Sequence, residues 1–365
     1  IYNCCCVLGL NNNIIYIPKQ NLCSDGIHYE PRWFKPWNSS QRDINNDKIG
    51  KFIINYIKET YSVKIGVEIC EDAWVHNRPA IELANSGVDV IVNLSASHFS
   101  FGKENTRRHL IEQSSRAYNC VYVYANLLGN EAGRVIYDGD TYIASCGRIV
   151  AEGKRLSFDD YTLIVKDVDI DRNSVRKLQS HEVNNESNYE IISHYNYANN
   201  IDYITEKYYK KIEMNIYESF TRAVTLGLWD YMGKSKTNGF ALSLSGGADS
   251  AAVACIIRSM VKTLIREKNA DFIESTFNVD SKTPELDKVI CSKLLTCVYQ
   301  STENSSDTTA KAAEALAKQI GAKFADVSVQ EIYQLYTNIV EKIAKRSISW
   351  DTDNIALQNI QARTR

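Results

Sequence analysis

The chain of 365 residues is too long for one ordinary hydrophobic core, so its length predicts two domains. Hydrophobic residues make up 44 % and charged residues 24 % of the sequence, proportions typical of a soluble globular protein. The formal net charge of −2 gives no electrostatic reason to expect a nucleic acid or an anionic membrane as partner.

The opening residues read as strand, and the chain begins at Ile1 without methionine and ends at Arg365 inside a helical pattern. We therefore expect a fragment with both ends removed. No apolar run reaches bilayer length and no signal peptide opens the chain. The ten cysteines lack metal-finger spacing, and Cys4 to Cys6 are consecutive, which agrees best with reduced thiols in a cytoplasmic enzyme.

Strands alternate with helices through the first half of the chain. Apolar runs bounded by turn residues predict the strands, and Pro79 followed by Gly87 marks the two ends of a helix. Several strands then follow one another through Gly-containing or polar turns, which indicates a layered sheet covered by helices. The expected strands are 1–8, 14–17, 63–69, 88–94, 120–125, 141–145, 148–152 and 161–170, and the expected helices are 79–86 and 103–118.

Residues 1–170 are therefore expected to form one domain and residues 204–365 another. Residues 171–203 between them are rich in Asn, Ser, His and Glu with little apolar period, which is typical of a linker. The second domain resumes with a long amphipathic helix and then alternates strand and helix, like a doubly wound α/β fold. Its expected helices are 204–232, 309–320 (ended by Gly321) and 332–344, and its expected strands are 240–244, which should be buried, and 324–329.

A cysteine directly follows the predicted strand 63–69, in the string Gly66-Val-Glu-Ile-Cys-Glu-Asp-Ala-Trp74. Cys70 thus lies at the carboxyl end of a strand, where open α/β sheets place active sites. Because an isolated cysteine is more often a small buried hydrophobe, the surrounding string is what favours catalysis. This string resembles the nucleophile turn of the nitrilase superfamily, whose Glu–Lys–Cys triad attacks amide or nitrile carbons.

The nitrilase resemblance implies a lysine upstream of Cys70 that supports the oxyanion. Lys19, in Ile14-Ile-Tyr-Ile-Pro-Lys19, follows a strand as it does in the family. The competitor is Lys35, in Arg32-Trp-Phe-Lys-Pro-Trp37, and we prefer Lys19 because the second string looks like a separate family landmark. The glutamate of the triad is expected upstream of the first residue.

The loop after the predicted strand 88–94 carries further candidates, in the string Asn93-Leu-Ser-Ala-Ser-His-Phe-Ser-Phe-Gly-Lys103. In the enzymes that it resembles, this loop holds the α-carboxylate and amino group of glutamine. By position, the resemblance gives this role to Ser97 and Lys103, with Glu71 meeting the α-ammonium group. His98 is a weaker candidate base, because a lone loop histidine is more often a packing residue.

The stretch Phe240-Ala-Leu-Ser-Leu-Ser-Gly-Gly-Ala-Asp-Ser250 predicts a strand, a tight turn and the start of a helix. Its two glycines let backbone N–H groups approach an anion, and the helix adds unpaired donors and the positive end of its dipole. Neither a Walker loop nor the dinucleotide fingerprint is present, and the string SGGADS resembles the ATP pyrophosphatases. The implied ATP-binding residues are Ser243, Ser245, Gly246, Gly247, Ala248, Asp249 and Ser250, and Asp249 is also expected to bind Mg²⁺.

A nitrilase-like amidase followed by an SGGxDS domain resembles the glutamine-dependent NAD⁺ synthetase family along nearly the whole chain. The implied fold is a nitrilase-like α-β-β-α sandwich followed by a doubly wound parallel-sheet ATP-pyrophosphatase domain. The implied enzyme is a homo-oligomeric ligase that hydrolyses glutamine at Cys70, carries ammonia through an internal channel and aminates deamido-NAD⁺ adenylated by Mg·ATP. Asn359 and Arg363, one helical turn apart, are implied to bind deamido-NAD⁺.

Two alternatives stay open at this point. The first is a stand-alone carbon–nitrogen hydrolase whose second domain binds nucleotide as a regulator. ATP-dependent release of pyrophosphate would distinguish it from a synthetase. The second is a catalytically silent scaffold. Finding the triad glutamate in the full-length gene would exclude this alternative.

Overall fold

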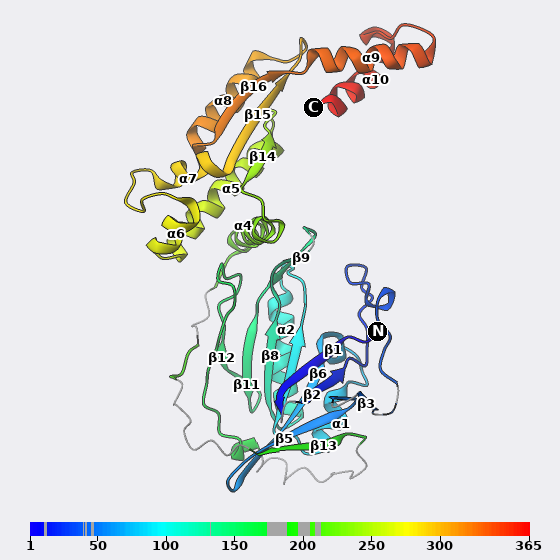
Figure 1. The fold of residues 1–365 in the computed structure, drawn as a ribbon, viewed down its shortest axis with the longest axis vertical. Helices are drawn as coiled ribbons and strands as arrows, with labels where there is room; N and C mark the ends of the chain where they lie inside the picture. The colour runs from blue at the N-terminus through cyan, green and yellow to red at the C-terminus, as the bar shows by residue number, and fades with distance from the viewer. Residues whose placement is uncertain are drawn as a thin grey trace. The chain divides into compact units, whose positions relative to one another are not determined.

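The computed structural model describes the whole chain apart from residues 11–12, 39, 41, 45–46, 132, 174–187, 196–204 and 209–212. The chain divides into two compact units, Ile1–Ser219 and Phe220–Arg365, which are described separately (Figure 1). Among the helices in the described part of the chain, none is both long and apolar enough to cross a membrane.

The main sheet of the first unit has seven strands: β5 (Phe52–Lys58), β6 (Tyr61–Ile69), β7 (Val90–Ser95), β8 (Val121–Asn126), β11 (Thr141–Ser145), β12 (Arg148–Glu152) and β13 (Glu190–Tyr195). Their order across the sheet is β12-β11-β8-β7-β6-β5-β13. The central strands β6, β7 and β8 are parallel, so their carboxyl ends lie along the same edge. This edge carries the candidate site.

A second sheet of the same unit contains β1 (Cys4–Leu10), β2 (Asn13–Pro18), β3 (Arg42–Ile44) and β4 (Asp47–Ile49), in the order β1-β2-β4-β3. Its inner face packs on the main sheet. Ile15 and Ile17 of β2 form a buried cluster with apolar residues of β5 and β6, namely Phe52, Ile54, Val67 and Ile69. The hairpin of β9 (Leu128–Glu131) and β10 (Val135–Asp138) completes the strands of this unit in the described residues.

Helices cover the opposite face of the main sheet: α1 (Pro79–Asn85) and α2 (Lys103–Ala117) (Figure 1). Strand alternation divides the apolar residues between the two faces, because Ile53 of β5 packs under α1 while its neighbours face β2. Gly66 of β6 brings α1 close: a Cβ added there would lie 2.7 Å from the Cδ2 atom of Leu83.

The second unit contains a parallel three-stranded sheet of β14 (Phe240–Ser243), β15 (Leu295–Ser301) and β16 (Lys323–Ser328), in that order. Helices connect the strands, as expected for a doubly wound arrangement. The predicted end of one of them at Gly321 is confirmed, because that residue has a left-handed φ of 82°. The helices are α4 (Ile216–Ser235), α5 (Ala248–Glu267), α6 (Ala270–Phe277), α7 (Leu286–Leu294), α8 (Asp307–Ile320), α9 (Gln330–Ala344) and α10 (Trp350–Thr364).

Four expectations about elements differ from the structure. The helix expected at 204–232 begins only at Ile216, as α4, and Lys207 within the expected range forms a β-bridge instead. Residues 161–170 were expected as a strand, but only Val165 forms a bridge, and Tyr161 and Leu163 lack a buried face. The stretch expected as a linker contributes β13 to the edge of the main sheet, where it pairs with β5. β14 is parallel as expected, but it is half-exposed rather than buried, because it is the edge strand of its sheet.

We expect Gly66→Ala to lower the free energy of unfolding of the first unit by about 1–3 kcal/mol, because its methyl group would displace the fully buried side chain of Leu83 in α1. Gly233→Ala in α4 is the matched control, since no atom lies within 4 Å of its added Cβ. Alanine there should stabilise the helix by about 0.5–1 kcal/mol. Urea unfolding measures both, and a Gly66→Ala protein as stable as the parent would contradict the close packing.

Candidate active site

Cys70 occupies a strained turn at the carboxyl end of a central strand. β6 ends at Ile69, and Cys70 begins the 3₁₀ turn Cys70–Ala73. Its φ of 49° lies in the left-handed region, which a non-glycine residue adopts at an energetic cost. The turn leaves the Cys70 side chain half-buried in the wall of a cavity.

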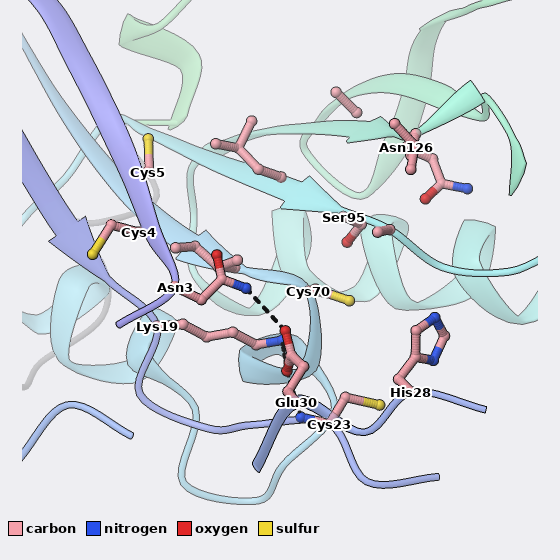
Figure 2. Close-up of a pocket in the computed structure, with 15 residues that line it drawn as sticks. Asn3, Cys4, Cys5, Lys19, Cys23, His28, Glu30, Cys70, Ser95 and Asn126 are labelled. Atoms are coloured by element: carbon pink, nitrogen blue, oxygen red, sulfur yellow. Dashed lines mark hydrogen bonds and ion pairs between the residues drawn. The ribbon is translucent and has the colours of Figure 1, made fainter. Parts of the chain in front are cut away.

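This cavity has a volume of about 390 Å³. Figure 2 shows Cys70, Lys19, Glu30 and His28 around it, contributed by segments far apart in the sequence. The carboxyl ends of β6, β7 and β8 form one side, and β1 and the segment after β2 form the other. The lining residues are Asn3, Cys4, Cys5, Lys19, Cys23, His28, Glu30, Ile69, Cys70, Leu94, Ser95, Ala96, Ala125, Asn126 and Leu127.

Lys19 is buried and ion-paired with Glu30 in this cavity. It follows β2, its side chain is 1 % exposed, and its Nζ atom lies 2.5 Å from Glu30 Oε2. The same oxygen accepts the N–H of Cys23 at 2.6 Å, while Oε1 accepts the Asn3 amide at 2.9 Å. Because both oxygens of Glu30 are engaged, this carboxylate is suited to fixing the lysine rather than to taking a proton. Lys35, the competing candidate, is exposed and does not line the cavity.

The buried carboxylate of Asp72 connects the Lys19 segment to the Cys70 turn. It accepts the backbone N–H groups of Asn21 at 2.7 Å and Gln20 at 3.2 Å. It also accepts the N–H of Ile69 at 3.1 Å. Burial raises the pKa of Asp72 to about 6, and the hydrogen bonds from Asn21 oppose the rise. One side chain thus sets the position of both the lysine and the cysteine segments.

A second buried group supports the strand before the cysteine. Glu68 of β6 accepts hydrogen bonds from the Arg78 guanidinium and the Tyr122 hydroxyl. Arg78 also donates to Ser114 of α2 at 3.0 Å. The guanidinium therefore satisfies the buried carboxylate and joins the strand to the covering helix.

The three predicted glutamine-binding residues lie near the site but do not line the cavity. Ser97 is buried, and its Oγ accepts a hydrogen bond from Arg107 at 3.4 Å. The Lys103 ammonium lies 3.2 Å from Nδ1 of His98, and burial lowers its pKa, with the Arg107 charge adding to the effect. Glu71 accepts the thiol hydrogen of Cys23, which helps to raise the pKa of that thiol behind the larger effect of burial.

Sequence reasoning missed Glu30, Asp72 and Arg107. Arg107 is fully buried on α2 and forms ion pairs with Asp138 and Asp140, which places it behind the loop of Ser97. Burial, followed by the neighbouring Asp138, raises the pKa of Asp140 to about 7. The available signals were local. Asp72 stands two residues after the cysteine, and Glu30 directly precedes the string Pro31-Arg-Trp-Phe-Lys-Pro-Trp37.

The predicted phosphate loop follows β14 and leads directly into α5. Gly246 has a φ of 78°, and a Cβ added there would lie 2.4 Å from the carbonyl oxygen of Thr309, so only glycine can occupy it. The Ser245 and Ser250 hydroxyls lie 3.1 Å apart, and Ser245 Oγ accepts the N–H of Gly247 at 3.3 Å. The exposed residues of this loop are Ser243, Ser245, Gly247, Ala248 and Asp249.

The last helix of the second unit meets the same edge of the sheet. Gln361 of α10 donates to the hydroxyl of Thr302, just past the end of β15, at 2.7 Å. Because β14 and β15 are parallel, the phosphate loop also lies at this carboxyl edge. Asn359 and Arg363 are both exposed on α10.

Comparisons with known proteins agree with two successive domains. Residues 1–179 match the family model for carbon–nitrogen hydrolase, and residues 220–365 match that for NAD synthase. The chain is 30 % identical to the glutamine-dependent NAD(+) synthetase of Macaca fascicularis and 31 % identical to that of Homo sapiens. Each alignment covers 100 % of this chain and 56 % of the relative, so the chain spans about half the length of these curated relatives.

A solved structure gives the same result. The crystal structure of a glutamine-dependent NAD(+) synthetase from Cytophaga hutchinsonii is 34 % identical, with a TM-score of 0.73. The match covers 100 % of this chain and 56 % of that one. The fold and the matches thus define a carbon–nitrogen hydrolase domain followed by an NAD synthase domain, which confirms the predicted fold class. Along its whole length the chain is similar to glutamine-dependent NAD(+) synthetases.

Replacing Asp72 should change how stability depends on pH. Because its folded pKa is raised, its stabilising contribution is full below about pH 4 and is lost as the pH rises through about 6. Asp72→Asn lacks this titration. Relative to the parent, its free energy of unfolding should therefore increase between about pH 4 and pH 7, by up to about 3 kcal/mol.

Urea unfolding across this pH range measures the difference between the two proteins. Hydrogen bonds lost in the variant shift the whole curve but do not give it a slope. A difference that stays constant with pH would contradict the raised pKa.

Proposed function

We propose that this protein is a glutamine-hydrolysing NAD⁺ synthetase, an ATP-dependent carbon–nitrogen ligase. The observation that carries the proposal is the cavity where Cys70 meets the Lys19–Glu30 ion pair, in a chain that continues into a phosphate-binding loop. Glutamine is the proposed nitrogen donor, and ATP and deamido-NAD⁺ are the proposed substrates of the second unit. The similarity of the chain to glutamine-dependent NAD(+) synthetases supports this choice of substrates.

In the first unit, the thiolate of Cys70 attacks the side-chain amide carbon of glutamine. The buried Lys19 ammonium, held by Glu30, stabilises the negative oxygen that forms on that carbon. The proton removed from the thiol passes to the leaving nitrogen, ammonia leaves, and water hydrolyses the thioester to glutamate. Ser97, Lys103 and Glu71 remain the proposed contacts of the α-carboxylate and α-ammonium groups.

In the second unit, the loop from Ser243 to Ser250 binds the phosphates of ATP through backbone N–H groups and the start of α5. Adenylation joins AMP to the nicotinate carboxylate of deamido-NAD⁺ and releases pyrophosphate, after which ammonia displaces AMP. Asn359 and Arg363 are the proposed contacts of deamido-NAD⁺ on α10.

The exposed carboxylate of Asp249 fits the proposed role in binding Mg²⁺. Mg²⁺ in such sites is bound by one or two carboxylates together with phosphate oxygens, and Asp249 stands in the first turn of α5 beside the loop. The bound ion would supply neutralisation of the charge on the departing pyrophosphate. The cytoplasmic location and the homo-oligomeric state stay predictions.

Cys70→Ala should separate the two nitrogen sources in the intact protein. NAD⁺ formation from glutamine should fall roughly a thousandfold or more, because no other group can form the thioester. Formation from ammonia should stay close to the parent rate. Cys6→Ala, at an exposed thiol, is the control and should change neither rate. Equal losses with both donors would argue against Cys70 as the nucleophile.

Asp249→Asn should impair synthesis from either nitrogen source while glutamine hydrolysis continues. The loss should fall mainly on turnover and amount to several kcal/mol of transition-state stabilisation, roughly a hundredfold or more in rate. Asp271→Asn, in the exposed first turn of α6, is the matched control.

Steady-state assays of NAD⁺ and pyrophosphate measure both variants. An Asp249→Asn enzyme that makes NAD⁺ from ammonia at the parent rate would exclude the proposed role. An intact parent protein that hydrolyses glutamine but never releases pyrophosphate from ATP would instead favour the stand-alone hydrolase.

A further inference from the structure

Cys23, Asp25 and His28 form a cluster on the segment between Lys19 and Glu30. One potential ligand atom from each residue lies within 4.8 Å of the other two. Sulfur, nitrogen and oxygen ligands together are the set that Zn²⁺ uses in proteins. We propose that this cluster binds a divalent cation of the zinc class at the glutamine cavity.

The Asp25–His28 pair already has the spacing of two ligands on one ion. Oδ2 of Asp25 lies 3.1 Å from Nδ1 of His28, close to the roughly 3.4 Å expected between two ligand atoms of tetrahedral Zn²⁺. Oδ1 of Asp25 accepts the N–H groups of Ile27 at 2.9 Å and of His28 at 2.7 Å. These bonds fix the carboxylate, and a cation would replace the proton that Oδ2 now shares with Nδ1 of His28.

The outer nitrogen of His28 has the support that metal-binding histidines use. Nε2 lies 3.4 Å from the hydroxyl of Tyr137, whose own hydrogen is donated to Glu131 at 2.6 Å. With Nδ1 on the ion, Nε2–H can donate to the tyrosine oxygen, which would fix the ring and its tautomer. The cluster thus has three ligand atoms and also a hydrogen-bond acceptor, the Tyr137 hydroxyl, for the outer nitrogen of His28.

The third ligand is the Cys23 thiol, which is buried and hydrogen-bonded to Glu71. Ion binding would transfer the thiol proton to solvent and replace the Cys23–Glu71 hydrogen bond with a metal–sulfur bond of about 2.3 Å. The sulfur already lies within 4.8 Å of a ligand atom of Asp25 and of His28, so a side-chain rotation would bring the three atoms around one ion. Glu71 and Asp25 add negative charge around the ion, while His98 and the Lys103 ammonium lie near His28 and Asp25.

Cys23 and His28 also line the cavity of Cys70 (Figure 2). Three protein ligands leave a fourth position open, and a cation there would occupy the space around the substrate. On the proposed function, the bound ion inhibits glutamine-dependent synthesis and spares ammonia-dependent synthesis. This consequence rests on the proposed glutaminase activity, whereas the binding site does not.

The test measures Zn²⁺ binding directly, by competition with a chromogenic chelator, in the intact protein carrying Cys70→Ser. This background removes the nucleophile as a competing thiol. In it, Asp25→Asn and His28→Gln should each weaken the tightest Zn²⁺ site by about tenfold or more. His109→Gln, at an exposed histidine of α2, and Cys6→Ser, at an exposed thiol, are matched controls that should leave the affinity unchanged.

Co²⁺ supplies a second readout, because a sulfur ligand produces a charge-transfer band that Cys23→Ser should remove. Circular dichroism checks that each variant is folded. If Cys23→Ser does not fold, the Zn²⁺ affinity of Asp25→Asn decides whether the site exists. Equal Zn²⁺ affinity in all variants, or a Co²⁺ band that survives Cys23→Ser, would overturn the site. Since these readouts need no catalysis, a protein without glutaminase activity would disprove the proposed function and still decide the metal site.

Discussion

The candidate active site depends on one buried carboxylate that holds two distant segments together. Asp72 accepts N–H groups from the residues after Lys19 and from Ile69 before Cys70, some fifty positions along the chain. Cys70 alone is a thiol on a turn, and Lys19 alone is a buried cation. Their meeting in one cavity follows from this shared acceptor and from the packing of β2 on β6.

Several buried charged side chains of the first unit are ion-paired. Lys19 pairs with Glu30, Arg78 with Glu68, and Arg107 with Asp138 and Asp140. Each pair carries a desolvation cost that only close partners offset, so the pairs favour one arrangement over alternatives more than they add net stability. All three lie at or behind the carboxyl edge of the main sheet, where geometry matters for chemistry.

The sequence allowed the prediction of what depends on neighbours along the chain. Cys70 directly follows a periodic apolar run, and the glycines of the phosphate loop stand between a strand and a helix, so both sites could be proposed from local pattern. Glu30 was missed because its role arises from a contact with Lys19, and its place directly before the string that starts at Pro31 was the only local signal. β13 was missed since its pairing with β5 joins residues more than 130 positions apart. The half-exposed state of β14 depends on its place in the sheet, which its own residues do not encode.

The left-handed backbone of Cys70 lowers the stability of the fold at the position of the proposed nucleophile. A glycine would adopt the φ of 49° without steric cost, and it would relieve strain that the present fold must hold. Selection for thermal resistance alone would therefore favour losing the thiol. On the proposed function, the chemistry of the sulfur is what the turn gains from a cysteine at that angle, at the expense of the fold that carries it.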